Sequence, residues 1–454
     1  MTYSNLIFAA VILPLSILAL FFDRSTEYKN LILCIVSLLF LAWGRSFGVL
    51  LVVLSIAVDY VLAYAVQGSG VKTAKSAVFM IVDLLWNAFL FVLLTKNEIF
   101  ASDGIFHLRN ALLPVGMAFY TLKNFSYVYD VFSGRIKAEK NIFCLFTYSV
   151  GYMFLLAGPL VRYGDIEPQI RHRELTTKKL SDGITRFAIG LAKAVMVVPV
   201  LERLYTSGLS ADEPTFAGAW LGMIAFFGYA YFAFAGLSDM GTGIALMNGF
   251  DTDVNYRRIS LGNMLGGLVE SYNTSFVKFL SDVRSDYGFA EITTVLLALF
   301  AALFYADVKY LLVFGLIIGL ILAIEYHIGC EKIKSLNPLL KLALTFVLSM
   351  LLFSPFAFES FSEWKVWLLQ LVGKGNLYAL STSVKYTIIN NCWLLALALI
   401  SVSPLGSLIQ SKLNQKAQES VKSMTAAKTL KTVCTAVILT ASYILLAVST
   451  LEAA

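Results

Sequence analysis

The chain has 454 residues, of which 58% are hydrophobic and only 14% are charged, and its mean hydropathy is +0.76. This composition excludes a soluble domain of this length, because a water-facing surface needs more charged residues than the chain carries. The net charge of +6 is spread over connections between apolar runs, which suggests contact with anionic membrane lipids and no binding of nucleic acid.

Apolar runs follow one another along the whole chain and predict an all-α integral membrane protein. A hydrocarbon core of about 30 Å needs about 20 helical residues per crossing, so the runs correspond to about ten to twelve transmembrane or partial helices. The clearest runs are 6–22, 31–43, 49–66, 77–94, 187–201, 216–234, 292–304, 310–326, 339–356, 393–402 and 433–448. Since neither a linker nor a repeat separates them, we expect a single polytopic membrane domain over residues 1–454.

The start of the chain and its most basic connections indicate how it is inserted. The first run begins almost at Met1, lacks a basic n-region and has no small-residue cleavage site, so we expect a retained span and no signal peptide. The most basic connections are 162–186 and 412–431, and the positive-inside rule places both in the cytoplasm.

Residue types that bind metals or form disulfides are few. The five cysteines show no C-x-x-C spacing and no pairing pattern, so we expect buried thiols. The three histidines, His107, His172 and His327, stand at no metal-ligand spacing from one another or from a cysteine, so we expect no metal site. Asp59 and Asp83 lie in spans without a recognised motif, and we expect them to pair helix to helix.

Three polar stretches occur where a simple bundle of helices would not need them. They are LLPVGMAFYTLKNFSYVYDVFSGRIKAEKN, LLAGPLVRYGDIEPQIRHREL, and FAFAGLSDMGTGIALMNGF with NYRRIS soon after it. Polar or charged segments at membrane depth are tolerated only when they are buried in protein or line a wet cavity. These stretches therefore predict a core that water enters.

In this order, the stretches resemble the membrane-bound O-acyltransferase family, and in particular its bacterial branch of alginate O-acetylation and teichoic acid D-alanyl transfer proteins. The resemblance is carried by LPVGMAFYTLKNFSYVYDVFSG, which contains Lys123, by GPLVRYGDIEPQI, and by YFAFAGLSDMGTGIALMNGF, which contains Ser238 and Asp239. It is centred on residues of about 110–330. Several motifs in order are more specific than any one of them.

The resemblance implies a fold, a substrate path and a place in the cell. The fold would be a ring of helices around a thin central tunnel, in the bacterial cytoplasmic (inner) membrane, crossed several times. An acyl group from a cytosolic thioester donor, acyl carrier protein or acyl-CoA, would meet an extracytoplasmic acceptor there, with no bound cofactor. The tunnel or motif residues would be Lys123, Ser238, Asp239 and Ser275, and the donor-side mouth would be Arg162, Tyr163 and Asp165.

Two of these roles stay open at the level of sequence. Asp239 is either a tunnel-lining group or a structural partner for Lys123 or Lys193, because a charge inside the membrane must first be paired. Arg162 and Asp165 either meet the donor or only tie the loop that follows a helix end.

The resemblance also implies two histidines at the centre of the tunnel, and this chain lacks both. The first belongs to a Trp-His-x-Ser motif, where Asn273 stands here two residues before Ser275, and the second falls on Tyr305. Asparagine cannot take up a proton, and tyrosine has an ordinary pKa near 10. Since loss of a general base costs about a hundred- to ten-thousandfold in rate, we expect a catalytically degenerate site.

Three functions follow from this departure. The first is a protein of cell-envelope polysaccharide acylation that acts as an acyl-donor conduit, scaffold or regulator. Its partners would be membrane lipids, an acyl carrier protein, and an extracytoplasmic acyltransferase or a second, histidine-bearing family member. The second is an active O-acyltransferase that uses proximity alone, or Tyr305 or Asp239 as an atypical base. The third is a transporter that reuses the tunnel.

Overall fold

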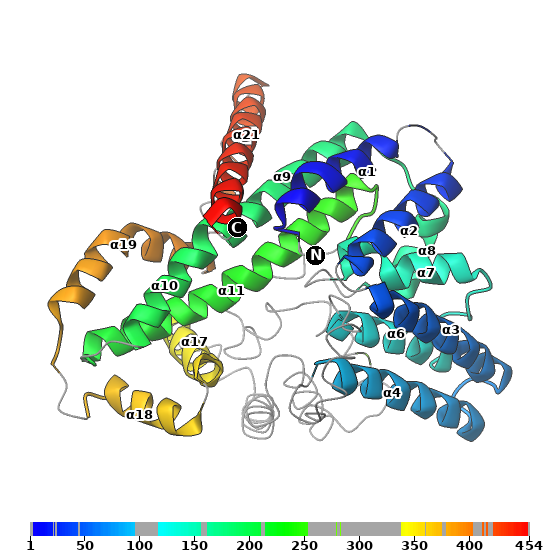
Figure 1. Ribbon diagram of the computed structural model, residues 1–454, viewed down its shortest axis with the longest axis horizontal. Coiled ribbons are helices and arrows are strands. Elements are labelled where there is room, and N and C mark those ends of the chain that lie inside the picture. Colours follow the sequence, from blue (N-terminus) through cyan, green and yellow to red (C-terminus); the bar gives the residue numbers. More distant parts are fainter. Residues whose placement is uncertain are drawn as a thin grey trace. The chain divides into compact units, whose positions relative to one another are not determined.

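The structure is a computed structural model of the chain (Figure 1) and describes residues 3–20, 22, 25–43, 46–95, 117–155, 161–209, 214–252, 278, 282, 337–358, 360–374, 378–402, 411–412, 415 and 421–452. The regular elements within these residues are helices, apart from a lone parallel bridge between Thr215 and Tyr378. This confirms the all-α integral membrane protein that the sequence predicts.

The chain divides into two compact units, and each takes up separate stretches of the sequence. Unit 1 consists of Met1–Leu191, Leu237–Val254 and Ile438–Ala454, and unit 2 of Ala192–Gly236 and Asn255–Val437. Because both units are assembled from distant stretches, the expectation of one domain over residues 1–454 stays a prediction.

The helices differ widely in length, from 3 residues in η3 to 32 residues in α11 and α21. In chain order they are η1 (a π-helix, Phe8–Ile12), α1 (Leu13–Ala19), α2 (Thr26–Ala42), α3 (Ser46–Gly68), α4 (Ala74–Thr95), α6 (Met117–Phe132), α7 (Ile142–Val150), η3 (a 3-10 helix, Tyr152–Phe154), α8 (Tyr163–Arg171), α9 (Thr177–Ala192), η4 (a π-helix, Lys193–Val197), α10 (Val198–Leu209), α11 (Phe216–Met247), α17 (Pro338–Phe353), η5 (a 3-10 helix, Ser354–Ala357), α18 (Phe361–Leu371), α19 (Thr382–Val402) and α21 (Val421–Glu452).

Among the described residues, five helical segments are long and apolar enough to cross a membrane: Val49–Gly68, Thr177–Leu209, Phe216–Met247, Thr382–Ser401 and Thr425–Leu451. Their length matches the roughly 20 residues that one crossing needs. The runs 292–304 and 310–326, which the sequence also predicts as spans, lie outside the described residues.

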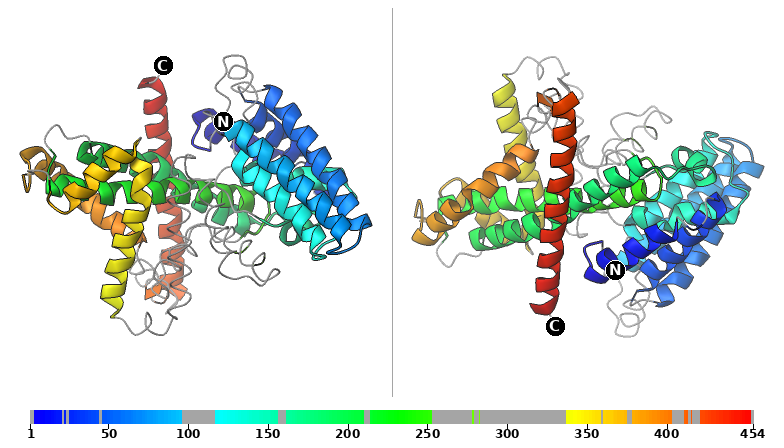
Figure 2. Two further views of the ribbon diagram at one scale, coloured as in Figure 1. Left: turned by 90° about the horizontal axis from the view of Figure 1, so that it is seen from below. Right: turned by 90° about the horizontal axis from the view of Figure 1, so that it is seen from above.

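In unit 1, α3, α4 and α6 pack against one another, and Figure 2 shows the three helices side by side. The N-terminal segment closes over an aromatic cluster of Tyr3, Phe8, Phe40 and Tyr152, whose ring centroids lie 5.1 to 6.2 Å apart. Tyr152 is further held at its backbone, where its carbonyl accepts from the Tyr3 hydroxyl at 2.5 Å and its N–H donates to Ser37 at 3.1 Å. The short η3 is thus fixed inside unit 1.

Two helix contacts depend on glycine. In unit 1, a Cβ at Gly183 of α9 would lie 2.7 Å from the carbonyl oxygen of Gly243 in α11. In unit 2, a Cβ at Gly208 of α10 would lie 2.7 Å from the backbone nitrogen of Gly222 in α11. Small residues let backbones approach closely at membrane helix interfaces, where van der Waals packing drives association.

Unit 2 is built around large apolar side chains of α10, α11, α17, α18 and α19. Its buried core includes Leu201, Phe227, Met350, Trp367 and Leu394. Tryptophan N–H groups at the edge of this core find partners, whereas Nε1 of the buried Trp367 makes no hydrogen bond to another described residue. For example, Trp220 donates to the Leu371 carbonyl at 3.2 Å, and Trp364 donates to Ser354 at 2.8 Å.

Candidate functional site

Lys123 is buried in α6, with 1% of its surface exposed. Its ammonium donates to the Tyr148 carbonyl at 2.6 Å and lies 5.0 and 5.4 Å from the ring centroids of Tyr148 and Phe154. A carbonyl and two aromatic faces partly replace the water that a buried ammonium loses. Lys123 therefore ties α6, which carries the first motif of the resemblance, to α7 and η3. Since its ammonium donates to Tyr148, the suggested pairing of Lys123 with Asp239 is wrong.

The structure pairs Asp239 with Arg186 of α9. The guanidinium donates through Nε at 3.0 Å and through Nη2 at 2.8 Å to the same carboxylate oxygen. The neighbouring Ser238 is buried. The ion pair explains how α11 continues as a helix through a charged residue, because the pairing offsets the cost of removing the carboxylate from water.

Tyr163, expected at the donor-side mouth, is a buried anchor. Only 2% of it is exposed, and its hydroxyl donates to the carboxylate of Glu139. Its ring packs edge-on against those of Tyr127 and Tyr148, at centroid distances of 5.1 and 5.2 Å. The side chain therefore fixes the start of α8 onto α6 and α7, and its role at the donor-side mouth stays a prediction.

Glu139 collects most of the hydrogen bonds in this region. It accepts from Tyr163, from the Asn141 backbone N–H at 2.7 Å and from Arg171 at 2.6 Å. Burial raises the pKa of Glu139, but these hydrogen bonds favour the ionised form and together hold the pKa below its ordinary value. The connection between α6 and α7 is thus locked to α8 by an ionised carboxylate.

Arg162 and Asp165 stand at the surface end of the same region. Arg162 precedes the first residue of α8, and its guanidinium lies 3.4 Å from Asp130, which also pairs with Arg135 at 3.2 Å. Asp165 is exposed in the first turn of α8, where the helix dipole favours a negative charge. Arg162 therefore ties the loop to the end of α6, and the expected role of Arg162 and Asp165 at the donor-side mouth stays a prediction.

Arg173 is a structural residue that sequence reasoning missed, because its stretch looks like a solvated helix start. It is 6% exposed, donates to the Asn248 carbonyl at 3.1 Å and to the Asn30 side chain at 2.5 Å, and lies 4.4 Å from the Phe250 ring centroid. Burial lowers the pKa of Arg173 to about 10. The sequence signal for this contact is Asn-Gly-Phe directly after α11, because Gly249, with a φ of +87°, ends the helix between the two residues that Arg173 contacts, Asn248 and Phe250.

These contacts bring the three motif segments together within unit 1. Lys123 reaches Tyr148, Tyr148 donates to the Val161 carbonyl at 3.0 Å, and Asn248 at the end of α11 donates to the Tyr152 hydroxyl at 3.0 Å. The segments that carry the family resemblance therefore form one packed polar region.

The expected catalytic positions Asn273 and Tyr305, and Ser275 beside the first, lie outside the described residues. So do His107 and His327. His172 is described and is exposed at the C-terminal end of α8. Within the part of the chain that the structure describes, no group of three or more histidine, cysteine, aspartate or glutamate residues could hold a metal ion.

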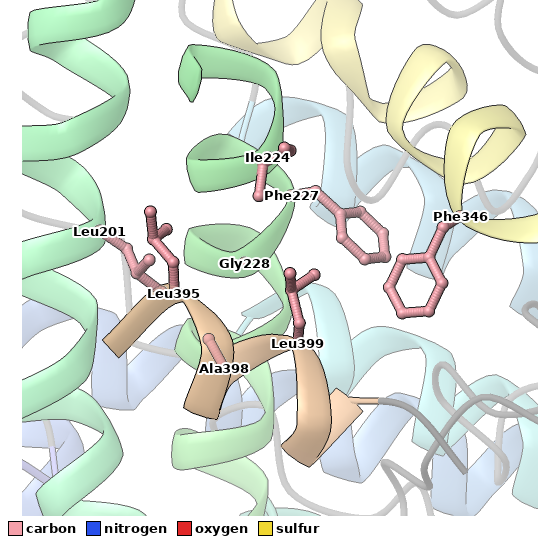
Figure 3. Close-up of a pocket in the computed structure, with 8 residues that line it drawn as sticks. All are labelled: Leu201, Ile224, Phe227, Gly228, Phe346, Leu395, Ala398 and Leu399. Atoms are coloured by element: carbon pink, nitrogen blue, oxygen red, sulfur yellow. The ribbon is translucent and has the colours of Figure 1, made fainter. Parts of the chain in front are cut away.

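Unit 2 contains a small apolar pocket between α10, α11, α17 and α19 (Figure 3). Its lining consists of Leu201, Ile224, Phe227, Gly228, Phe346, Leu395, Ala398 and Leu399. Such a surface offers no side chain that could bind a charged group or move a proton. The pocket therefore has no catalytic group.

Comparison with known proteins gives the family. No protein-family model matches the chain. It is 30% identical over 367 residues to the "Probable alginate O-acetylase" of Pseudomonas aeruginosa, which covers 77% of this chain and 70% of that protein. Identity to the protein of the same description from Pseudomonas syringae pv. tomato is 30% over 369 residues, with the same shares.

The name of a more distant relative gives a different polymer as its acceptor. The chain is 24% identical over 292 residues to the "Peptidoglycan O-acetyltransferase" of Helicobacter pylori, over 56% of this chain and 55% of that protein. The order of the motifs, their packing in unit 1 and the similarity over most of the chain all support the same family. This integral membrane protein belongs to the membrane-bound O-acyltransferase family.

Proposed function

We propose that the protein takes part in O-acylation of a cell-envelope polysaccharide without catalysing the transfer itself, as an acyl-donor conduit, scaffold or regulator in the bacterial cytoplasmic membrane, which it crosses several times. The names of its relatives, alginate O-acetylase and peptidoglycan O-acetyltransferase, support the class of acceptor. A partner, either an extracytoplasmic acyltransferase or a second, histidine-bearing family member, would complete the reaction.

The observation that carries this proposal is the absence of a base where the family resemblance requires one. Asn273 and Tyr305 occupy the two histidine positions, and the whole chain has only three histidines. Asp239 is a poor substitute, because the guanidinium of Arg186 occupies one oxygen of its carboxylate with two hydrogen bonds. A hydroxyl nucleophile without a general base reacts slowly at neutral pH.

The donor side supports a retained binding role. Basic side chains border α8 and the connection between α6 and α7, and we call Arg135, Lys137, Lys140, Arg162 and Arg171 the basic rim. Lys137 and Lys140 are exposed. Such a rim attracts acidic or phosphate-bearing molecules and speeds their encounter, which fits an acyl carrier protein or acyl-CoA.

Donor binding and turnover can be measured on one sample. The purified protein in lipid vesicles is given an acyl carrier protein or coenzyme A that carries a labelled acetyl group. Retained label and label transferred to polysaccharide are then counted. We expect bound donor and no transfer above empty vesicles. Transfer at the rate of an alginate O-acetylase would contradict the degenerate site, and absence of both would contradict the conduit.

A charge variant tests whether the basic rim holds the donor. We expect Lys137→Ala combined with Lys140→Ala to weaken donor binding by roughly tenfold, the effect of about 1.4 kcal/mol, and to reduce its salt dependence. Lys374→Ala, an exposed lysine of unit 2, is the matched control and should bind as the unaltered protein does. Equal binding by all three proteins would place the donor elsewhere.

A further inference from the structure

Two aspartates lie buried between α3, α4 and α6 of unit 1. Asp59 is near the middle of α3 and is 1% exposed, and Asp83 is near the middle of α4 and is 0% exposed. The segment Val49–Gly68 around Asp59 is apolar and long enough to cross the membrane. Ionisable residues at such a depth are costly, and they mark functional sites by default.

Two asparagines join the aspartates. The Asn87 amide nitrogen donates to Asp59 Oδ1 at 3.1 Å and lies 3.4 Å from Asp83 Oδ2. The Asn124 amide nitrogen, from α6, donates to Asp59 Oδ2 at 2.7 Å. Both oxygens of Asp59 therefore accept from amides, whereas Asp83 has one long contact with the Asn87 amide and a hydrogen bond with the carboxyl group of Asp59.

Four oxygens around this pair are buried and make no hydrogen bond to another residue that the structure describes. They are Asp83 Oδ1, Ser55 Oγ, Asn87 Oδ1 and Asn124 Oδ1. Ser55 is 0% exposed and stands one helical turn before Asp59, on the same face of α3. Buried polar atoms are nearly always satisfied, so this group of unpartnered oxygens indicates a ligand that oxygen atoms bind.

Among the described residues, side chains of the surrounding helices do not neutralise the two carboxyl groups. From α6, the Tyr120 hydroxyl donates to the Val52 carbonyl at 3.1 Å, and the Lys123 ammonium donates to the Tyr148 carbonyl at 2.6 Å. The remaining titratable side chains on the helices that pack against α3 and α4 are Glu27, Tyr28, Lys29 and Cys34 of α2, Tyr60 and Tyr64 of α3, Lys75 of α4, Tyr127, Tyr129 and Asp130 of α6, and Cys144 and Tyr148 of α7.

Of the described ion pairs, none involves Asp59 or Asp83. Two carboxylates sharing one buried site cannot both stay ionised without a counter-charge.

We propose that Asp59 and Asp83 form a binding site for one small monovalent cation, a proton or a sodium ion, at the middle of the membrane. Asp59 accepts from two amides, and Asp83 takes the cation at its unpartnered oxygen. Oxygen ligands suit hard cations. The site is independent of acyl transfer, and the proposal holds whether or not the protein is an enzyme.

Infrared spectroscopy of the protein in lipid detects the ligand directly. In choline chloride at neutral pH, we expect the band of a protonated, buried carboxyl group. If sodium is the ligand, added NaCl removes the band and raises the midpoint of thermal unfolding. If the proton is the ligand, NaCl changes neither, and the band is lost only at alkaline pH. Absence of the band together with absence of a sodium effect would overturn the proposal.

Variants assign the signal to these residues. We expect the band, or the sodium response, to be lost in Asp83→Asn and in Asp59→Asn and to be retained in Glu174→Gln, which removes an exposed carboxyl group. A band and a sodium response that survive both aspartate substitutions would place the ligand elsewhere and overturn the proposal. The measurement on the unaltered protein decides the case if a variant does not fold.

Discussion

Glu139 connects α8 to the loop between α6 and α7 through three hydrogen bonds. Because the pKa of Glu139 in the folded protein lies below its ordinary value, this carboxylate stabilises the fold above a pH of about 4.3, the ordinary value for glutamate. That stability is lost as the pH falls through the folded-state pKa.

We expect Glu139→Gln to lower the free energy of unfolding at neutral pH by about 1–3 kcal/mol, because Arg171 and Tyr163 lose a charged acceptor. The variant should also lose less stability than the unaltered protein on acidification. Thermal unfolding in detergent between neutral and acidic pH measures both effects. Glu174→Gln, at an exposed glutamate, is the control, and an equal response of the two variants would argue against a locked carboxylate.

The ion pair of Arg186 and Asp239 gives a second prediction at this scale. Each single variant, Arg186→Gln or Asp239→Asn, leaves one partly buried polar group without its partner, so the double variant should be more stable than the sum of the single losses predicts. The expected coupling is about 0.5–3 kcal/mol for residues in direct contact. Strictly additive losses in a double-mutant cycle of thermal unfolding would refute the pairing.

Individual residues also show why the sequence alone predicts the site only in part. Asp239 can be recognised as a charge that needs a partner, but Lys123, Lys193 and Arg186 are all basic residues at plausible places in the sequence. The choice depends on which helix faces α11, and this is a tertiary property. Tyr163 looks like a surface residue in a charged stretch, yet it is buried because Glu139 and two tyrosine rings converge on it.

Helix packing in unit 1 depends on small residues. A Cβ at Gly243 of α11 would lie 2.6 Å from the backbone nitrogen of Phe187 in α9, and the backbone cannot yield as a flexible side chain could. We expect Gly243→Ala to lower the midpoint of thermal unfolding by forcing α9 and α11 apart.

The matched control is Gly68→Ala at the end of α3, where an added Cβ meets nothing within 4 Å. Alanine is favoured over glycine in a helix by about 0.5–1 kcal/mol, so this variant should be neutral or more stable. If both substitutions have the same effect, the close approach of α9 and α11 is wrong.

At the scale of elements, apolar periodicity predicts that helices exist better than it predicts where they end. The run 49–66 lies within α3, Ser46–Gly68. The run 216–234 ends too early, since α11 continues to Met247 through the polar Ser238 and Asp239. The run 187–201 is likewise part of a longer helical segment, Thr177–Leu209, which includes the π-helix η4.

For the whole molecule, the distribution of basic residues predicts the topology. We expect the connections 162–186 and 412–431 to face the cytoplasm. In a variant whose five native cysteines are replaced, a new cysteine introduced by His172→Cys should react in intact cells with a membrane-permeant maleimide and not with an impermeant one. Reaction with the impermeant reagent would invert the topology and would place the basic rim on the wrong side for a cytosolic donor.

The ring of helices and its central tunnel stay predictions, because they depend on how spans distant in the sequence are placed around one another. Hydropathy fixes the length of a span and says little about its neighbours. The family follows instead from motif order and from similarity over most of the chain.

The central claim is that a member of an acyltransferase family has lost its catalytic base. The most direct test is the initial rate of acetyl transfer from a labelled thioester donor to polysaccharide, measured for the unaltered protein in lipid vesicles and for a variant with Asn273→Ala and Tyr305→Phe. We predict that both rates equal that of vesicles without protein. Transfer by the unaltered protein that the two substitutions abolish would contradict this account and would require a mechanism without histidine.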